Sequence, residues 1–230
     1  MTVKAIITDI EGTTTDIAFV HKVLFPYASE HLPHFIRDQL SQSEVAAQLS
    51  AVSSEVGAKL SAEQAIEQLL KWIADDVKAP PLKALQGMIW KHGYENGDFQ
   101  GHLYDDAANY LSQWHRQDIA LYVYSSGSIQ AQKLLYGFSS HGDLTPLFSD
   151  YFDTAVGHKQ RSASYAAILE RIPHQAEQCL FLSDVVGELD AAADNGIRTA
   201  LISRGEQLSK TESHQMFSDF EQVHKTFITN

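Results

Sequence analysis

Two carboxylates stand close together where an apolar run near the amino terminus ends. In "AIITDIEGTTT", residues 5–15, Asp9 and Glu11 are two positions apart and are followed by Gly12 and three threonines. A carboxylate can attack phosphorus to form an aspartyl-phosphate, which divides a hydrolysis into two easier displacements. A second acid nearby can protonate the departing oxygen and later activate water. A turn after a strand explains either acid alone, but the pair with its glycine and hydroxyls favours a site for a metal ion and a phosphate.

A second polar group follows another apolar run, in "YVYSSGS". Ser125, Ser126 and Gly127 stand between a predicted strand and the predicted helix "IQAQKLL". Hydroxyl groups and the free N–H groups of a helix start form a site for an anion. Capping of the helix by a serine explains this stretch equally well when it is taken alone.

Lys159, in "GHKQRSASYAAIL", precedes another predicted helix. A lysine at the start of a helix opposes the helix dipole, so capping explains it poorly. A lysine in a surface loop is one alternative. As a phosphate ligand, Lys159 would supply positive charge and help to keep Asp9 ionised.

The fourth group is "LFLSDVVGELD", in which Asp184 ends an apolar run and Glu188 follows one helical turn later. Acids in the first turn of a helix are favoured by its dipole, which is a sufficient explanation for Glu188. Asp184 at a strand end is different, because with Asp9 it could hold Mg²⁺, an ion that needs only one or two protein carboxylates.

The composition restricts the partners. The chain has 230 residues, 44% of them hydrophobic, and a formal net charge of −12. This charge argues against nucleic acid or an anionic membrane as a partner, and it means that a phosphate site must supply its own positive charge. No apolar run is long enough to cross a bilayer, and the single Cys179 cannot form an internal disulfide. We therefore expect a cytoplasmic protein.

The elements that must position these groups are short apolar strands separated by helices. The expected strands are residues 3–10, 119–126, 151–157, 179–185 and 198–204. Helical patterns between most of them predict an α/β fold with a parallel sheet. Ligands of such sheets bind beyond the carboxyl ends of the strands, where Asp9, Ser125 and Asp184 are expected.

A long stretch without strands interrupts this alternation after the first strand. Its patterns predict successive helices over residues 19–39, 43–57, 61–77 and 81–94, and Ser61 with Gln64 predicts a capping box for the third. The simplest architecture is a doubly wound core with an inserted helical cap.

In their order and spacing, these groups resemble the haloacid-dehalogenase-like hydrolase superfamily. Most members carry Asp at the position of Glu11. This difference and the segments "DIEGTTT", "YSSGS", "GHK", "LFLSD", "LKALQGMIWKHGYENG" and "AQKLLYG" resemble the enolase-phosphatase (acireductone synthase) subfamily of methionine salvage. The resemblance implies a Rossmann-like core over residues 1–16 and 105–230 and a helical cap over residues 17–104.

The resemblance also implies the roles of the site residues. Asp9 and Glu11 would be catalytic, and one Mg²⁺ per chain would be held by Asp9, Glu11 and Asp184, with Glu11 contributing its backbone carbonyl. Ser125, Ser126 and Lys159 would bind the substrate. Glu188 would contact these side chains and not the substrate or the metal ion. Phe25, Trp90 and Tyr94 are candidates for contacting the substrate's tail, although packing within the cap explains each of them better.

The implied reaction is the conversion of 2,3-diketo-5-methylthiopentyl-1-phosphate, through its enol, to 1,2-dihydroxy-3-keto-5-methylthiopentene and phosphate. We nominate Glu11 as the base for enolisation, with a cap residue as the alternative. The competing hypotheses are a Mg²⁺-dependent phosphatase of another small ester, a phospho-receiver module and a dehalogenase. We expect a monomer that binds a small phosphorylated diketone, without nucleic acid or membrane partners.

Overall fold

The computed structural model describes residues 2–205 and 213–229. The chain consists of two compact units. Residues 1–17 and 101–230 form the first, which we call the sheet unit, and residues 18–100 form the second, which we call the helical unit.

The sheet unit contains one parallel sheet, which confirms the predicted α/β fold class. Within the described residues it has six strands, in the order β3-β2-β1-β4-β5-β6. The strands are β1 (Ala5–Thr8), β2 (Ala120–Tyr124), β3 (Phe148–Phe152), β4 (Cys179–Ser183), β5 (Arg198–Ile202) and β6 (Met216–Phe217). Every residue of β1 and β4 is buried, as expected for central strands whose two faces are both covered.

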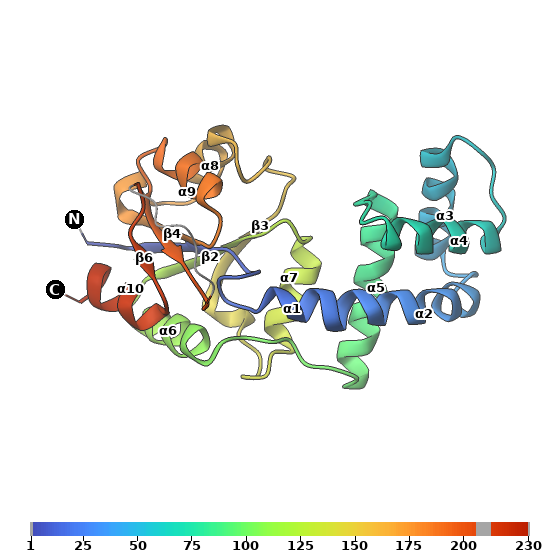
Figure 1. The fold of residues 1–230 in the computed structure, drawn as a ribbon, viewed down its shortest axis with the longest axis horizontal. Helices are drawn as coiled ribbons and strands as arrows, with labels where there is room; N and C mark the ends of the chain where they lie inside the picture. Colours follow the sequence, from blue (N-terminus) through green and yellow to red (C-terminus); the bar gives the residue numbers. More distant parts are fainter. Residues whose placement is uncertain (1, 206–212, 230) are drawn as a thin grey trace. The chain divides into compact units, whose positions relative to one another are not determined.

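Helices cover both faces of this sheet. They are α6 (Asp105–Arg116), α7 (Ile129–Gly137), α8 (Ser162–Leu169), α9 (Val186–Ala193) and α10 (Phe220–Phe227). Figure 1 shows α8 and α9 on one side of the strands and α6 and α10 on the other. Tyr165 of α8 and Leu189 of α9 are completely buried against Ile7 and Phe181 of the central strands.

The structure differs from the expected strands in two places. The third strand was expected over residues 151–157, but β3 starts at Phe148 and ends at Phe152. The chain turns after β3 because Asp153 accepts a hydrogen bond from the backbone N–H of Ala155 through its side chain (2.9 Å). The two-residue strand β6 was not predicted, since two residues carry no period.

The register of the central strands aligns their carboxyl ends. Thr8 of β1 pairs with Val123 of β2 on one side and with Leu182 of β4 on the other. The residues that follow these strands, Asp9 and Asp184 among them, therefore reach the same edge of the sheet. We call this the carboxyl edge.

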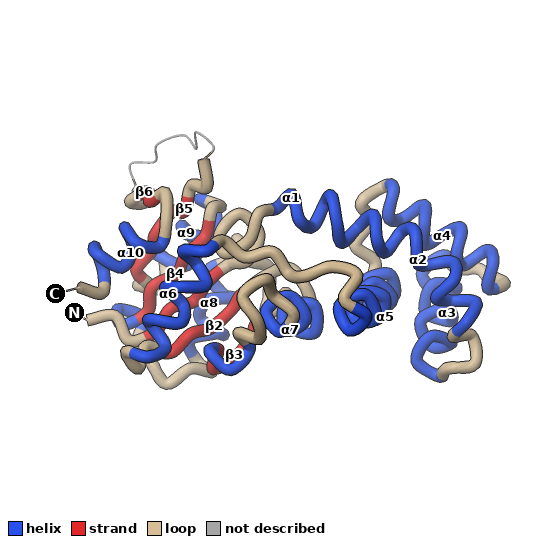
Figure 2. Tube along the Cα trace, turned by 90° about the horizontal axis from the view of Figure 1, so that it is seen from below, coloured by secondary structure: helices blue, strands red, loops and turns tan. Residues whose placement is uncertain are grey.

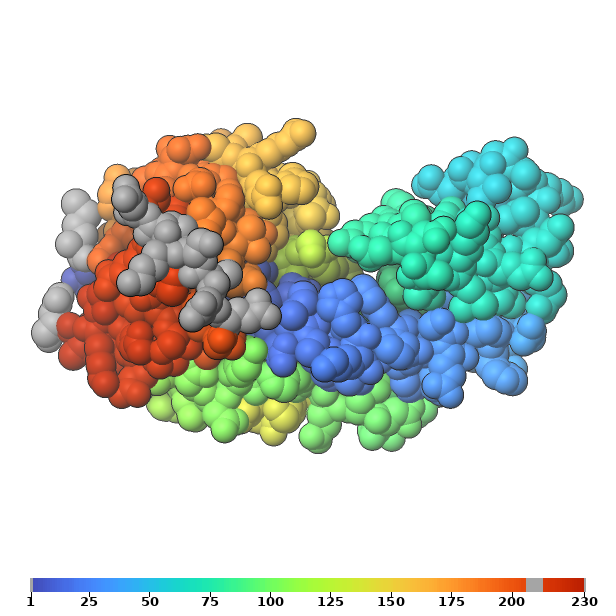
Figure 3. Space-filling view, viewed as in Figure 1, coloured from blue at the N-terminus to red at the C-terminus, as the bar shows by residue number. Residues whose placement is uncertain are grey.

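The insert after β1 is entirely helical, as predicted (Figure 2). Its helices are α1 (Ile17–Phe19), a π-helical turn (Val20–Leu24), α2 (Phe25–Asp38), α3 (Ser43–Val56), α4 (Ala62–Ala74) and α5 (Pro80–Asn96). Figure 3 shows α2 in blue beside α3 and α4 in cyan to teal on the surface of the helical unit. The capping box is confirmed, because Ser61 accepts from the N–H of Gln64 and Gln64 accepts from the N–H of Ser61.

The helical unit has its own apolar core, in which Leu32, Val52, Leu69 and Leu85 are completely buried. The aromatic residues considered for contact with a substrate's tail also pack inside this unit. The rings of Phe25 and Trp90 stack at 6.3 Å between centroids, the Trp90 indole N–H donates to the Leu24 carbonyl (2.8 Å), and Tyr94 is 4% exposed. These contacts show that the three residues pack within the helical unit, and their contact with a substrate's tail stays a prediction. No helix in the described ranges is long and apolar enough to cross a membrane.

Candidate active site

The turn after β1 is built by its glycine and its three threonines. Gly12 has a φ of +73°, a conformation that favours glycine, and a Cβ atom there would collide with the Asp184 carboxylate. The Ile10 carbonyl accepts from the backbone N–H groups of residues 13–15 (2.9–3.2 Å). The Thr14 hydroxyl contacts the Tyr136 hydroxyl (3.0 Å). The three threonines are completely buried, and the hydroxyl of Thr14 bonds across to α7.

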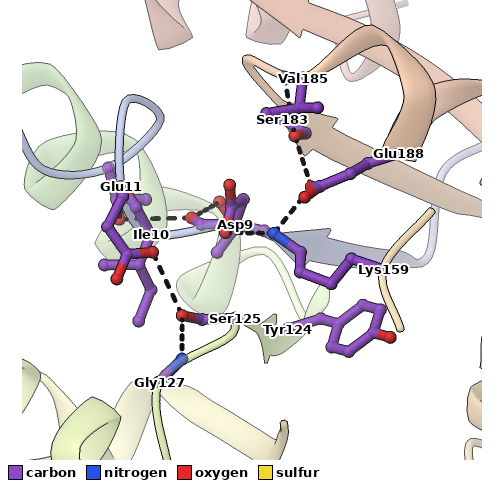
Figure 4. A network of polar contacts seen from close by, with 12 residues as sticks. Asp9, Ile10, Glu11, Tyr124, Ser125, Gly127, Lys159, Ser183, Val185 and Glu188 are labelled. Atoms are coloured by element: carbon purple, nitrogen blue, oxygen red, sulfur yellow. Dashed lines mark hydrogen bonds and ion pairs between the residues drawn. The ribbon is translucent and has the colours of Figure 1, made fainter. Parts of the chain in front are cut away.

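Lys159 is held between two carboxylates at the carboxyl edge. Its Nζ lies 2.6 Å from Asp9 Oδ1 and 2.7 Å from a carboxylate oxygen of Glu188. Figure 4 shows Asp9 and Glu188 reaching the Lys159 nitrogen from opposite sides. Burial alone would lower the pKa of Lys159, but the two carboxylates outweigh it and raise the pKa above its usual value. Lys159 is therefore a positively charged partner of Asp9. It lies in the loop before α8 and is only 6% exposed.

Glu11 points to a different partner, Ser125. The Ser125 hydroxyl donates to a carboxylate oxygen of Glu11 (3.2 Å) and accepts from the N–H of Gly127 (3.1 Å), as Figure 4 shows. Burial, followed by the negative charge of Asp9, raises the pKa of the Glu11 carboxyl. A carboxyl with a raised pKa can hold a proton and release it to a departing oxygen.

The two alternatives for the serine stretch can now be separated. Ser128 caps α7, with its hydroxyl accepting from the N–H of Ala131 (3.3 Å). Ser125 is completely buried and faces Glu11, so helix capping does not explain it. Ser126 is exposed beside it.

Asp184 follows β4 directly and lies against the turn that contains Gly12. Burial, followed by the charge of Asp9, raises the pKa of Asp184 to about 7. Its Oδ1 atom is buried and has no hydrogen-bond partner in the part of the chain that the structure describes. Such an atom is costly to bury unless a ligand or cation compensates it.

The donors at the carboxyl edge fit one Mg²⁺. Asp9 and Asp184 follow the neighbouring strands β1 and β4, and their repulsion is part of what raises the pKa of Asp184. Over residues 2–205 and 213–229, no three His, Cys, Asp or Glu side chains are arranged to hold a metal ion together. Mg²⁺ does not require three, because it keeps several waters and binds through one or two carboxylates. The carboxylates of Asp9 and Asp184, the second with its unpaired Oδ1 atom, are thus a donor set of the kind that Mg²⁺ uses.

Two contributors were not found from the sequence. The Ser183 hydroxyl donates to Glu188 (2.9 Å) and so orients the carboxylate that faces Lys159. The Tyr124 ring lies 5.8 Å from Lys159 Nζ, where it can stabilise a cation. Ser183 stands beside Asp184 in "LFLSD" and could have been suspected, but nothing in the sequence pairs Tyr124 with Lys159.

A parallel sheet that presents an aspartate after its first strand, with a lysine and further acids at the same edge, defines the class of haloacid dehalogenase-like hydrolases. A sequence model of the haloacid dehalogenase-like hydrolase family matches residues 3–196. Enolase-phosphatase E1 of Pseudomonas aeruginosa (strain UCBPP-PA14) is 58% identical over 205 residues, which cover 89% of this chain and 91% of that protein. Enolase-phosphatase E1 of Alcanivorax borkumensis is 52% identical over 222 residues, which cover 96% and 98% of the two chains. This chain belongs to the enolase-phosphatase E1 family.

Solved structures show the same fold. The crystal structure of the UTR4 protein from Saccharomyces cerevisiae has a TM-score of 0.83 and 36% identity, covering 96% of this chain and 99% of that one. The magnesium-bound hydrolase YfnB from Bacillus subtilis has a TM-score of 0.61 at 17% identity, with 98% of both chains covered, and shares the fold. The resemblance stated from the sequence is confirmed, and the chain is a hydrolase.

Proposed function

We propose that this chain converts 2,3-diketo-5-methylthiopentyl-1-phosphate, through its enol, to 1,2-dihydroxy-3-keto-5-methylthiopentene and phosphate in methionine salvage. The name of its relatives, enolase-phosphatase, contains both halves of this reaction. The observation that carries the proposal is the division of labour at the carboxyl edge. Asp9 is paired with Lys159, whereas Glu11 accepts a hydrogen bond from Ser125, and the pKa of its carboxyl is raised.

In the phosphatase half, Asp9 is the nucleophile. Its carboxylate attacks phosphorus, the bond to the substrate oxygen breaks, and an aspartyl-phosphate forms. Lys159 neutralises charge on the phosphoryl oxygens, and Ser125, Ser126 and the N–H groups before α7 hold them. Lys159 and Ser125 are already held by hydrogen bonds and ion pairs, so they need little reorganisation at the moment of reaction.

Glu11 serves as acid and then as base in this scheme. Its raised pKa favours the protonated form, which can donate to the departing oxygen. Once it has lost that proton, the same carboxylate can take one from the water that cleaves the aspartyl-phosphate. The enolisation comes first, and for it we nominate the ionised form of Glu11 as the base, with a residue of the helical unit as the alternative. Removing the proton next to the carbonyl would leave Glu11 protonated, ready to donate to the departing oxygen.

Asp9 and Asp184 would hold one Mg²⁺ through their carboxylates, and Glu11 through its backbone carbonyl. When bound, the ion supplies positive charge for the phosphoryl oxygens and polarises the diketone. Glu188 pairs with Lys159 beside this group (2.7 Å), and the Ser183 hydroxyl donates to Glu188 (2.9 Å). The orphan Oδ1 atom of Asp184 supports this part of the proposal.

The helical unit acts as a cap in this proposal, excluding water and selecting the methylthio tail. All of the side chains proposed to bind, attack or protonate the phosphate come from the sheet unit of one chain. A monomer therefore suffices for the proposed activity, and we place it in the cytoplasm on the composition of the chain.

The test supplies the diketone phosphate to the purified protein and follows ultraviolet absorbance and free phosphate in the same cuvette. We expect a transient enol signal, then the acireductone signal with one phosphate per substrate, and loss of phosphate release in EDTA that added Mg²⁺ restores. Phosphate release without an enol or acireductone signal would overturn the proposed substrate and favour a phosphatase of another small ester. Unchanged phosphate release in EDTA would overturn the metal assignment.

A further inference from the structure

Arg204 connects the far end of the chain to the turn that carries the catalytic carboxylates. It lies two residues beyond β5, at the carboxyl edge, and its side chain is only 10% exposed. Its Nε donates to the backbone carbonyl of Thr13 (2.9 Å), a residue 191 positions away in the sequence. Thr13 belongs to the turn after Asp9 and Glu11.

The guanidinium of Arg204 is itself fixed from several sides. Its Nη1 lies 2.8 and 2.7 Å from the two carboxylate oxygens of Asp106, in the first turn of α6. Asp106 also accepts from the N–H of Phe220, which starts α10 (2.8 Å). The guanidinium carbon lies 4.3 Å from the ring centroid of Tyr104 and 5.0 Å from that of Phe220. Arginine at such a stacked, doubly bonded position loses little further freedom when its Nε forms another hydrogen bond.

The segment before α6 also bonds to this turn, and the Thr15 hydroxyl donates to the His102 carbonyl (2.6 Å). The Thr14 carbonyl accepts from the N–H of Tyr104 (3.0 Å), next to the bond from Arg204 to Thr13. Gly12, the neighbour of Thr13 in the chain, packs so closely against Asp184 that no Cβ atom would fit. A displacement of Thr13 would therefore change the spacing between Gly12 and Asp184 as well as the direction of Glu11.

We propose that Arg204, oriented by Asp106, is a positioning residue for the reaction, because it holds the Thr13 carbonyl and thereby sets the turn that carries Asp9 and Glu11. This inference rests on the proposed roles of those two residues, and it adds a role for Arg204 and Asp106 that those assignments do not contain. The Arg204 side chain bonds to a backbone carbonyl of the turn, so Arg204 is not a catalytic residue. Its charge is matched by Asp106, so it acts through geometry and not as a second Lys159.

The main test is Arg204→Met, with Arg37→Met as the matched control. Arg37 forms a similar two-point pair with Glu63 (2.8 and 2.6 Å), but in the helical unit and exposed to solvent. We expect Arg204→Met to lower kcat about 10- to 100-fold, because a small misplacement of reacting groups has effects of this size. KM should change much less, and Arg37→Met should match the wild type.

Two further readouts separate positioning from a general loss of structure. Guanidinium ion at low millimolar concentration should restore part of the kcat of Arg204→Met and none of any loss in Arg37→Met. Asp106→Asn, whose amide oxygen can still accept from Phe220, should lower kcat in the same direction by a smaller factor. This second variant keeps the test informative if Arg204→Met fails to fold.

Wild-type kcat in folded Arg204→Met or in folded Asp106→Asn would overturn the proposal. A loss that only follows the folded fraction measured by circular dichroism, without rescue by guanidinium, would overturn it as well. Assays run with the diketone phosphate and with p-nitrophenyl phosphate keep the two proposals apart. A wild-type protein that hydrolyses only the second ester contradicts the proposed function, and the Arg204 comparison is then decided on that ester.

Discussion

The two units of this protein differ in where their charged side chains lie. At the carboxyl edge of the sheet unit, Asp9, Lys159 and Glu188 are all at least 90% buried, and Asp184 has an orphan oxygen. In the helical unit, the core is apolar and ion pairs such as Arg37 with Glu63 lie in solvent, with side chains 47% and 59% exposed.

This difference separates two kinds of buried residue. The apolar core residues of the helical unit stabilise the fold, whereas the buried charges at the carboxyl edge cost free energy of folding. An exposed ion pair contributes little to stability, and burying charges carries a desolvation cost that their attraction does not always repay. The helical unit avoids this cost because none of its buried side chains, in residues 18–100, is charged. The carboxyl edge accepts it, and concentrated buried charge with shifted pKa values is typical of functional sites.

The largest effect should come from Asp9→Asn. The amide cannot form the aspartyl-phosphate, so phosphate release should fall by at least about 10⁴-fold. Lys159 retains its pair with Glu188, so the fold should be intact by circular dichroism. Asp38→Asn, an exposed acid of the helical unit, is the control and should behave as the wild type. Near-normal turnover in Asp9→Asn would end its assignment as nucleophile.

Lys159→Met should be the next most harmful change to catalysis. It removes the ammonium that neutralises the phosphoryl oxygens, and loss of one such group typically lowers kcat by about 10²–10³-fold. Lys91→Met, which breaks an exposed pair with Glu95, should leave steady-state kinetics unchanged. Equal effects of the two substitutions on kcat would break the comparison between buried and exposed charge.

Leu69→Ala tests the helical unit from the opposite direction. Leu69 is completely buried in the core of that unit, so truncation should lower the free energy of unfolding by about 2–5 kcal/mol, measured in urea. Leu40→Ala, at a 43% exposed position, should change it far less. We expect kcat of the folded Leu69→Ala protein to stay within about threefold of wild type, since no reacting group is moved. A large loss of kcat without a loss of stability would contradict the division of roles.

The smallest expected effect is on the stability of the metal-free protein and its dependence on pH. The folded-state pKa of Asp184, about 7, lies above its ordinary value, 3.8, so ionising this group weakens the folded state. Its cost is fully present above pH 7, shrinks as the pH falls below that value and is gone near pH 3.8. In EDTA at pH 8, Asp184→Asn should therefore be more stable than wild type by about 1–2 kcal/mol, allowing for partial exposure.

This gain should shrink at pH 5, where the folded wild type is largely protonated at Asp184. Urea unfolding at both pH values measures it, and saturating Mg²⁺ should reverse the order at pH 8. A constant difference between the two proteins at pH 5 and pH 8 would contradict the shifted pKa.

The sequence predicts the parallel core and the placement of Asp9, Ser125 and Asp184 because local patterns determine where a strand ends. Parallel strands then bring their carboxyl ends to one edge. The limits of β3 were wrong because the residues after Phe152 are apolar enough to continue a strand, and only the turn at Asp153 ends it.

Contacts between distant segments could not be predicted in this way. Arg204 reaches Thr13 across 191 positions, and no spacing or period relates them. The choice between Ser125 and Ser128 as the cap of α7 also required the structure, since both serines precede the same helix. Tertiary packing determines which distant residues meet, and the pattern of one segment carries no information about that packing.

The most direct test of this account is to identify the side chain that becomes phosphorylated during turnover. Protein saturated with the diketone phosphate would be quenched in acid within milliseconds, digested and analysed by mass spectrometry. We predict a phosphoryl adduct on Asp9 that is absent from Asp9→Asn. An adduct on any other side chain of the wild type would contradict the account.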